Sequence, residues 1–200
     1  MNYLAHILLA SHSDHAMVGA FLGDFLRPSD AAHLPHELQR ELWLHRYVDS
    51  YTDAHPEVRA ARQCCQPKLR LLARVALDVY FDHLLSRHWT QFSDQPIGEL
   101  ADRFYAAMDD LSAQLPTEIR LTAKRMRRYD WLRSYVHYSA VEQSVQSIGR
   151  RLSRGADRLQ AALAELHAAE DEVQARFLRF FPQLQAFAEQ RRAEMQLASE

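Results

Sequence analysis

The chain has 200 residues, 48% hydrophobic and 25% charged, with a formal net charge of −2. These values are typical of one globular domain and exclude a disordered chain, a collagen and a coiled-coil rod. Five glycines and seven prolines are too few for a turn-rich all-β fold, and the charge does not favour a nucleic-acid partner.

The hydrophobic periodicity predicts helices from one end of the chain to the other and no strand. In chain order we expect helices over residues 2–11, 15–26, 35–54, a short segment after Pro56, 67–89, 97–115, 116–129, 131–153 in one or two pieces, and 156–181. Asn2 is expected to cap the first helix, and Pro182 to kink or end the last. Short connections favour one all-α helical bundle over residues 1–190, followed by a polar, frayed tail over 191–200.

The sequence shows neither a transmembrane segment nor a signal peptide. No apolar run approaches the ~18 residues that a membrane span needs, so we expect no membrane partner. The apolar start has no Lys or Arg before it and is interrupted by His6, unlike a signal peptide. The two cysteines, Cys64 and Cys65, are adjacent, which excludes a disulfide framework and favours a cytoplasmic location.

Two acids interrupt the apolar row of the helix predicted at 67–89. The row reads Leu71, Val75, Asp78, Asp82, Leu85 and Trp89. Buried carboxylates four residues apart repel unless they are protonated, paired or bound to a cation. With His83 next in sequence, they suggest a metal or catalytic site. The alternative is a solvated seam with the row rotated by one residue.

A second polar row lies on the helix predicted at 35–54. His45, Asp49 and Asp53 are each four residues apart and share one face, with Arg46 beside them. Imidazole and carboxylate ligands suit a divalent cation such as Mn²⁺ or Mg²⁺. The alternative is a surface row in which Arg46 pairs with Asp49 or Asp53.

Two further ionisable residues stand in apolar surroundings. Asp24 follows Gly23 within an apolar run, and His6 lies within the apolar first helix. Taken alone, either residue can be a hydrogen-bonded core group. Because four predicted helices each carry such a residue, one site fed by several helices explains them together.

Two segments are rich in basic residues. The first contains Arg59, Arg62, Arg70 and Arg74, and the second contains Lys124, Arg125, Arg127 and Arg128. Solvated helix faces explain them most simply. The alternative is docking of an acidic protein or a phosphate-bearing substrate.

Several linked motifs resemble the acyl carrier protein phosphodiesterase family. They are Met1-Asn2-Tyr3-Leu4-Ala5-His6, Gly23-Asp24-Phe25, His45-Arg46-x-x-Asp49-x-x-Thr52-Asp53-x-His55-Pro56 and Asp78-x-x-x-Asp82-His83-x-x-x-x-His88-Trp89. The resemblance implies an all-helical, HD-domain-like fold with a C-terminal helical extension, from a divergent branch of the HD-type metal-dependent phosphohydrolases. It also implies hydrolysis of 4′-phosphopantetheine from holo acyl carrier protein with Mn²⁺, Mg²⁺ or another divalent cation.

The same resemblance suggests roles for the singled-out residues. A subset of Asp24, His45, Asp78, Asp82 and His83 would hold the cation and carry out catalysis, helped by His6, Asp49 and Asp53. Arg46 would stabilise charge on phosphate or brace Asp49, and the two basic segments would bind the acidic carrier protein. Two other functions stay open: a phosphohydrolase acting on a nucleotide or other small phosphodiester, and a non-catalytic helical metal-binding protein.

Overall fold

The computed structural model describes residues 1–152 and 154–197, and its regular elements are helices throughout that part of the chain. The α-helices are α1 (Tyr3–Leu9), α2 (Asp14–Leu22), α3 (His36–Ala54), α4 (Pro56–Gln63), α5 (Arg70–Arg87), α6 (Ile97–Asp110), α7 (Thr117–Arg128), α8 (Trp131–Ser134), α9 (Tyr138–Arg151), α10 (Ala156–Ala168) and α11 (Glu170–Leu197). The all-α prediction is confirmed. Within the described residues, no helix has both the length and the apolar character needed to cross a membrane.

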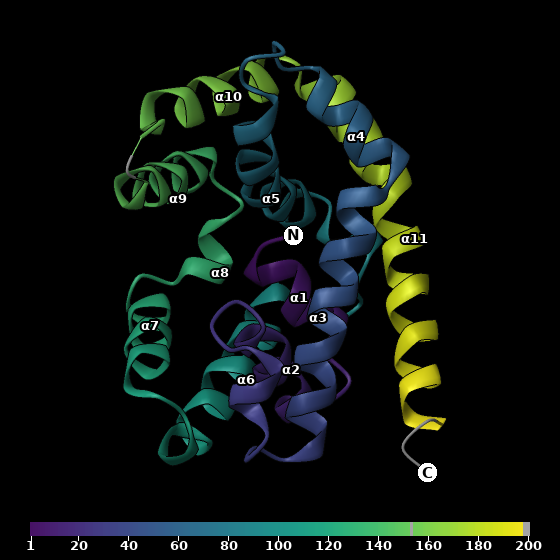
Figure 1. Cartoon of the computed structure of the whole chain (residues 1–200), viewed down its shortest axis with the longest axis vertical. Helices are drawn as coiled ribbons and strands as arrows, with labels where there is room; N and C mark the ends of the chain where they lie inside the picture. The colour runs from purple at the N-terminus through teal and green to yellow at the C-terminus, as the bar shows by residue number, and fades with distance from the viewer. Residues whose placement is uncertain (153, 198–200) are drawn as a thin grey trace.

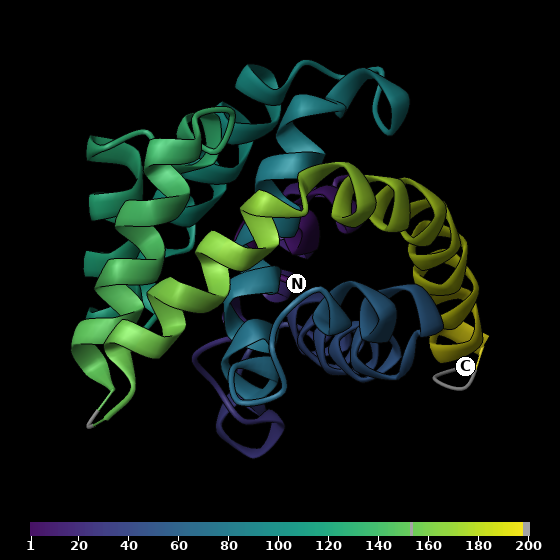
Figure 2. The same cartoon turned by 90° about the horizontal axis from the view of Figure 1, so that it is seen from above.

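The helices surround α1 and α5, which lie at the centre of the molecule (Figure 1). Helices α2 and α3 pack closely against each other, and α11 runs along α3 and α4. Helices α7, α8 and α9 form a column on the opposite side from α11, and α10 packs on α5 and α9. Seen from above, α10 and α11 bend around this centre (Figure 2). The first residues of the chain therefore lie deep inside the fold.

An aromatic cluster and a buried ion pair attach α11 to the rest of the protein. Phe177 and Phe181 of α11 are fully buried, and Phe177 packs against Phe81 of α5 with 5.2 Å between ring centroids. Farther along, Arg192 donates hydrogen bonds of 2.9 and 3.0 Å to the buried carboxylate of Glu41 in α3. Pairing satisfies a carboxylate whose burial would otherwise be costly, so α11 is fixed along its length.

Many predicted helix boundaries agree with the structure to within two residues because local signals set them, but α2 ends at Leu22 and not at 26, α5 begins at Arg70 and not at 67, and α6 ends at Asp110 and not at 115. Ser13 caps α2 by accepting a hydrogen bond from the Ala16 amide, and the His55-Pro56 pair separates α3 from α4. The segment after Trp131 is split into α8 and α9, one of the two alternatives expected. Residue 153, its expected end, lies outside the described residues.

The expectations for the C-terminal part were wrong in two respects. A break at Ala169 separates α10 from α11, and Pro182 lies inside α11, so of the two expected effects of Pro182, a kink or an end, the end is excluded. The stretch expected to fray from 191 is helical through Leu197, since Arg192 is tied to Glu41. Residues 198–200 lie outside the described residues.

Two local expectations also need correction near the site. Leu71 is 80% exposed, so the apolar face of α5 does not begin there; Ala73, Ala76 and Leu77 carry it instead. Asn2 occupies the N-cap position of α1 but its side chain makes no capping bond. It donates a 2.7 Å hydrogen bond to the Tyr135 hydroxyl.

Candidate metal centre

His45, a buried residue of α3, lies at the centre of the predicted cluster. Its Nδ1 is 2.8 Å from the carbonyl oxygen of Ala20, and because a carbonyl can only accept, Nδ1 carries the proton. The other nitrogen of a neutral ring, Nε2, then presents a lone pair. Gly23 makes this placement possible, because a β-carbon there would lie 2.2 Å from His45 Cγ.

The lone pair of His45 faces carboxylates. Nε2 lies 3.3 Å from Oδ2 of Asp49 and 3.8 Å from Oδ1 of Asp24. Acceptors that face each other at these distances repel unless a proton or a metal ion lies between them. A backbone hydrogen bond on the far nitrogen is also how proteins orient a histidine ligand.

His6 of α1 completes the centre from the other side. Its ring stacks on that of His45 with centroids 3.7 Å apart, and its Nε2 lies 3.2 Å from Oδ1 of Asp49. Burial, together with the neighbouring His45, lowers the pKa of His6 to about 3, so its ring is neutral at physiological pH. Burial alone would raise the pKa of Asp49, but the adjacent imidazoles of His45 and His6 and the nearby Met1 ammonium hold it well below its usual range.

The ligand atoms of His6, His45 and Asp49 all lie within 4.8 Å of one another, a geometry that can hold a metal ion. Two imidazole nitrogens and a carboxylate suit a divalent transition metal, and Asp24 offers a further oxygen next to His45. Enclosure raises the pKa of Asp24. The side chains of Asp24 and Asp49 stay partly open to solvent, which leaves a path for an incoming group.

The amino group of Met1 lies at the edge of this cluster. It is 3.1 Å from Oδ1 of Asp78 and 3.4 Å from Oδ1 of Asp49. Burial alone would lower the pKa of this amine, but Asp78 and Asp49 raise it to about 10. The ammonium therefore balances part of the negative charge and connects Asp78 of α5 to the centre.

Asp82, predicted as a ligand, lies at the start of α1. Its oxygens accept hydrogen bonds of 2.8 and 3.2 Å from the backbone amides of Leu4 and Ala5. A carboxylate in this position satisfies free N–H groups and faces the positive end of the helix dipole. Burial raises the pKa of Asp82 to about 7, although these two hydrogen bonds act in the opposite direction.

The structure does not bring His83, Arg46 or Asp53 into the three-residue cluster. His83 Nδ1 donates to the carbonyl of Tyr135 at 2.6 Å, and its ring packs near aromatic residues of α5 and α9. Arg46 is exposed and donates to the Leu26 carbonyl at 3.0 Å.

Asp53 is held by two arginines of the first basic segment. It accepts from Arg62 at 2.6 Å and pairs with Arg74 at 2.5 Å. Two cations that were expected to face a partner therefore neutralise an acid of α3. Arg59 and Arg70 of the same segment are exposed.

Sequence reasoning gave His6 and Asp49 supporting roles and did not consider the amino group of Met1. The spacing of His45 and Asp49 on one helix face was the available signal for Asp49. Only the packing of α1 against α2 and α5 places His6 and Met1 there, and spacing along the chain does not encode that packing.

Comparisons with known proteins agree with the motifs. A family model described as acyl carrier protein phosphodiesterase matches residues 1–184. Curated proteins named acyl carrier protein phosphodiesterase from Salmonella agona (strain SL483), Salmonella newport (strain SL254) and Salmonella heidelberg (strain SL476) are each 33% identical over 189 residues, which are 94% of this chain and 97% of the relative. No solved structure was found to match. Since these matches span nearly the whole of both sequences, the chain belongs to the acyl carrier protein phosphodiesterase family and is a hydrolase of the phosphodiesterase class, as its motifs predicted.

Proposed function

We propose that this protein hydrolyses the phosphodiester that joins 4′-phosphopantetheine to a serine of holo acyl carrier protein. Water attacks phosphorus, the bond between phosphorus and the serine oxygen breaks, and that oxygen takes up a proton. The products are apo carrier protein and 4′-phosphopantetheine. Family membership supports the substrate. The free thiols of Cys64 and Cys65 fit the cytoplasm as the place of this reaction.

One observation carries the chemistry of the proposal. Nε2 of His45, the ring nitrogen that is not bonded to Ala20, faces Asp49 and Asp24, and His6 approaches Asp49 from the other side. This arrangement is best explained by a divalent cation held by His6, His45 and Asp49. We propose Mn²⁺, with Mg²⁺ or another divalent ion as alternatives, because mixed imidazole and carboxylate ligands suit it. A histidine and aspartate centre in an all-helical fold also supports the proposed kinship with HD-type phosphohydrolases.

When bound, such a cation supplies Lewis-acid activation of water and of the phosphodiester. The protein's own groups position and move the proton. Asp24 is the proposed general base, because its raised pKa makes its carboxylate a better proton acceptor and its side chain is partly open. Asp78 holds the Met1 ammonium beside Asp49, and Arg46 holds the segment after Asp24 through the Leu26 carbonyl.

Asp82 and His83 have positioning roles in this proposal. Asp82 fixes the start of α1, which carries His6, and His83 fixes Tyr135, whose hydroxyl accepts from Asn2. Both residues act on the centre through α1.

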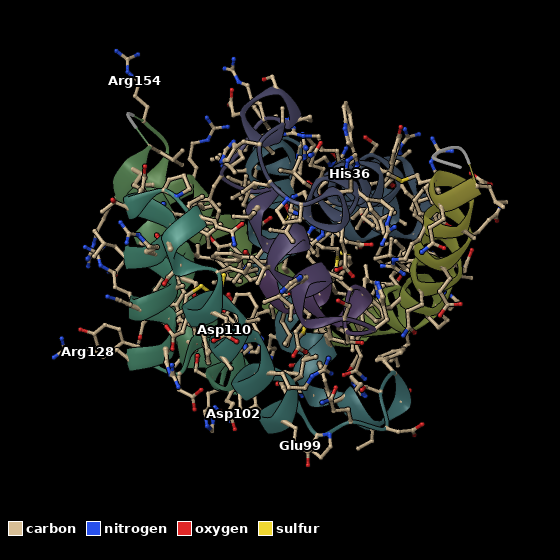
Figure 3. All side chains as sticks on the ribbon, turned by 90° about the horizontal axis from the view of Figure 1, so that it is seen from below. His36, Glu99, Asp102, Asp110, Arg128 and Arg154 are labelled. Atoms are coloured by element: carbon tan, nitrogen blue, oxygen red, sulfur yellow. The ribbon has the colours of Figure 1, made fainter. Side chains whose placement is uncertain are left out.

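The second basic segment, in α7, is the proposed docking surface for the carrier protein. Lys124, Arg125 and Arg128 are exposed, and Arg128 extends outward from the molecule (Figure 3). An acidic partner is attracted to such a cluster, and α7 also contributes Glu118 and Ile119 to the wall of a hollow that reaches Asp24. Helix α4, which carries Arg59 and Arg62 of the first basic segment, lies on the opposite side of the molecule from α7 in both views, so we assign these two residues no contact with the carrier protein.

An intact-mass assay tests this function. Holo acyl carrier protein is incubated with the protein and Mn²⁺, with parallel samples that contain EDTA or EDTA followed by excess Mn²⁺. We expect loss of one phosphopantetheine unit with Mn²⁺, no loss with EDTA, and recovery after Mn²⁺ is restored. An unchanged carrier protein with folded, Mn²⁺-loaded protein would contradict the proposal. Turnover of nucleotide phosphodiesters in that case would favour the small-substrate alternative.

A further inference from the structure

A sizeable hollow lies among the start of the chain and the helices that follow α7. It has a volume of about 510 Å³ and opens between the start of the chain, α8 and α9. One part of its wall is aromatic and includes Tyr3, Trp131 and Tyr135. The part formed by α9 is polar and includes Gln143, Ser144 and Ser147. Its size is in the range of small-molecule binding sites.

A second hollow connects this cavity to the centre. It has a volume of about 380 Å³, shares Tyr3 and Arg151 with the first, and reaches Asp24. Asp24 in turn lies 3.8 Å from His45 Nε2. The two hollows therefore adjoin at Tyr3 and Arg151, and the second extends to Asp24 at the edge of the centre.

From this arrangement we infer that the larger cavity binds the pantetheine arm of the substrate and that Arg151 binds its phosphate. The inference rests on the proposed function and adds to it the residues that recognise the prosthetic group. The arm has two amides, a hydroxyl and a branched apolar carbon, so it needs hydrogen-bonding and apolar walls together. The α9 side chains can bond the amides, and the aromatic wall can cover the apolar part.

Arg151 suits the phosphate for electrostatic reasons. The phosphodiester carries a negative charge, and guanidinium groups form strong charge-assisted hydrogen bonds with phosphate oxygens. Asp24 and Glu118 line the second hollow and repel an anion, so a cation there offsets their charge. Arg150 is adjacent in sequence and is exposed, but it pairs with Gln146 and lines neither hollow, which makes it a matched control.

Binding of two small probes tests the inference without catalysis. Pantetheine and 4′-phosphopantetheine are titrated calorimetrically into the full chain in the presence of EDTA. Both should bind the wild type. Ser144→Phe, which fills the cavity, should weaken both by about tenfold or more. Arg151→Gln should weaken only 4′-phosphopantetheine, and Arg150→Gln neither. Circular dichroism establishes whether each variant is folded. If Ser144→Phe does not fold, Arg151→Gln still tests the inference, because Arg151 is exposed and its substitution should not disturb the core.

The outcomes separate this inference from the function on which it rests. If holo carrier protein is converted but Ser144→Phe and Arg151→Gln bind both probes like the wild type, the inference is overturned and the function stands. If the probes bind as expected but holo carrier protein is not converted, the cavity assignment stands and the function fails. Binding of adenosine 5′-monophosphate in place of pantetheine would also overturn the inference, in favour of a nucleotide.

Discussion

The imidazole of His45 owes its orientation to one residue of α2 and to the glycine that follows this helix. The Ala20 carbonyl accepts a hydrogen bond from Nδ1, and Gly23 leaves room for the ring. The close approach of α2 and α3 therefore sets the orientation of the His45 ring in the centre. A glycine in this place is required by space, because its backbone is ordinary right-handed helix.

Gly23→Ala tests this close approach. The added methyl group would overlap His45 Cγ, so we expect the ring to move and the affinity for Mn²⁺ to fall about tenfold or more. Gly98→Ala is the matched control, because its β-carbon would meet only the movable side chain of Arg133 at 3.3 Å. Titration with Mn²⁺ measures both variants. If Gly23→Ala and the wild type bind Mn²⁺ equally well, the hydrogen bond to Ala20 alone sets the orientation of the His45 ring.

His6 gives the metal-free protein a specific pH dependence. Its pKa is about 3 in the folded protein and 6.5 for an ordinary histidine, so between these values the unfolded chain binds more protons. The contribution of His6 to the free energy of unfolding is therefore fully present above about pH 6.5 and is lost as the pH falls toward 3. We expect His6→Gln to lose less stability than the wild type between pH 6.5 and 5, by about 2 kcal/mol.

Denaturant unfolding in EDTA at several pH values measures this difference. His33→Gln is the control, because His33 is exposed, and it should follow the wild type. Parallel curves for His6→Gln and the wild type would contradict a buried, neutral His6.

Helix α1 is the element that assembles the centre. It is only seven residues long, too short to be stable alone, and Asp82 of α5 binds its first amides. The helix then delivers His6 to His45 and the amino group of Met1 to Asp78. The row of acids in α5 is thus divided: Asp82 holds a helix, and Asp78 faces the centre.

Asp82→Asn distinguishes a helix-holding role from a metal ligand. The amide would turn a donor toward a backbone N–H, so we expect a loss of about 1–3 kcal/mol in the free energy of unfolding while Mn²⁺ binding is retained. Asp110→Asn, on the exposed end of α6, should leave stability unchanged. Full stability with abolished Mn²⁺ binding would instead make Asp82 a ligand.

The sequence predicted these elements better than their contacts. Periodicity and prolines located most helices, and the four-residue spacing placed His45 and Asp49 on one face. Which partner each acid of α5 meets depends on packing between distant segments. The stacking of His6 on His45 joins residues 39 positions apart, which no local pattern encodes. Leu71 shows the same limit, since its exposure follows from the rotation of α5 in the bundle.

Charge on the molecular surface should govern encounter with the carrier protein. Helix α7, which carries exposed cations, borders the hollow that reaches Asp24, while α4 lies on the opposite side of the molecule. Surface attraction between proteins weakens as salt shortens its range. We therefore expect KM for holo carrier protein to rise about tenfold between 0.05 and 0.5 M salt.

Paired variants locate this effect. Arg125→Ala/Arg128→Ala should raise KM at low salt and flatten its salt dependence, whereas Arg59→Ala on α4 should behave like the wild type. Steady-state kinetics across salt concentrations measure both. If instead only the substitution in the first basic segment raises KM, that segment is the docking surface.

The most direct test of the account is the ligand set of the cation. Electron paramagnetic resonance of free Mn²⁺ measures its affinity for the wild type, His45→Gln and His83→Gln. With the centre at His6, His45 and Asp49, we expect His83→Gln to bind within about threefold of the wild type and His45→Gln about 100-fold or more weakly. Retained affinity in His45→Gln together with lost affinity in His83→Gln would contradict the account and return the centre to the acids of α5.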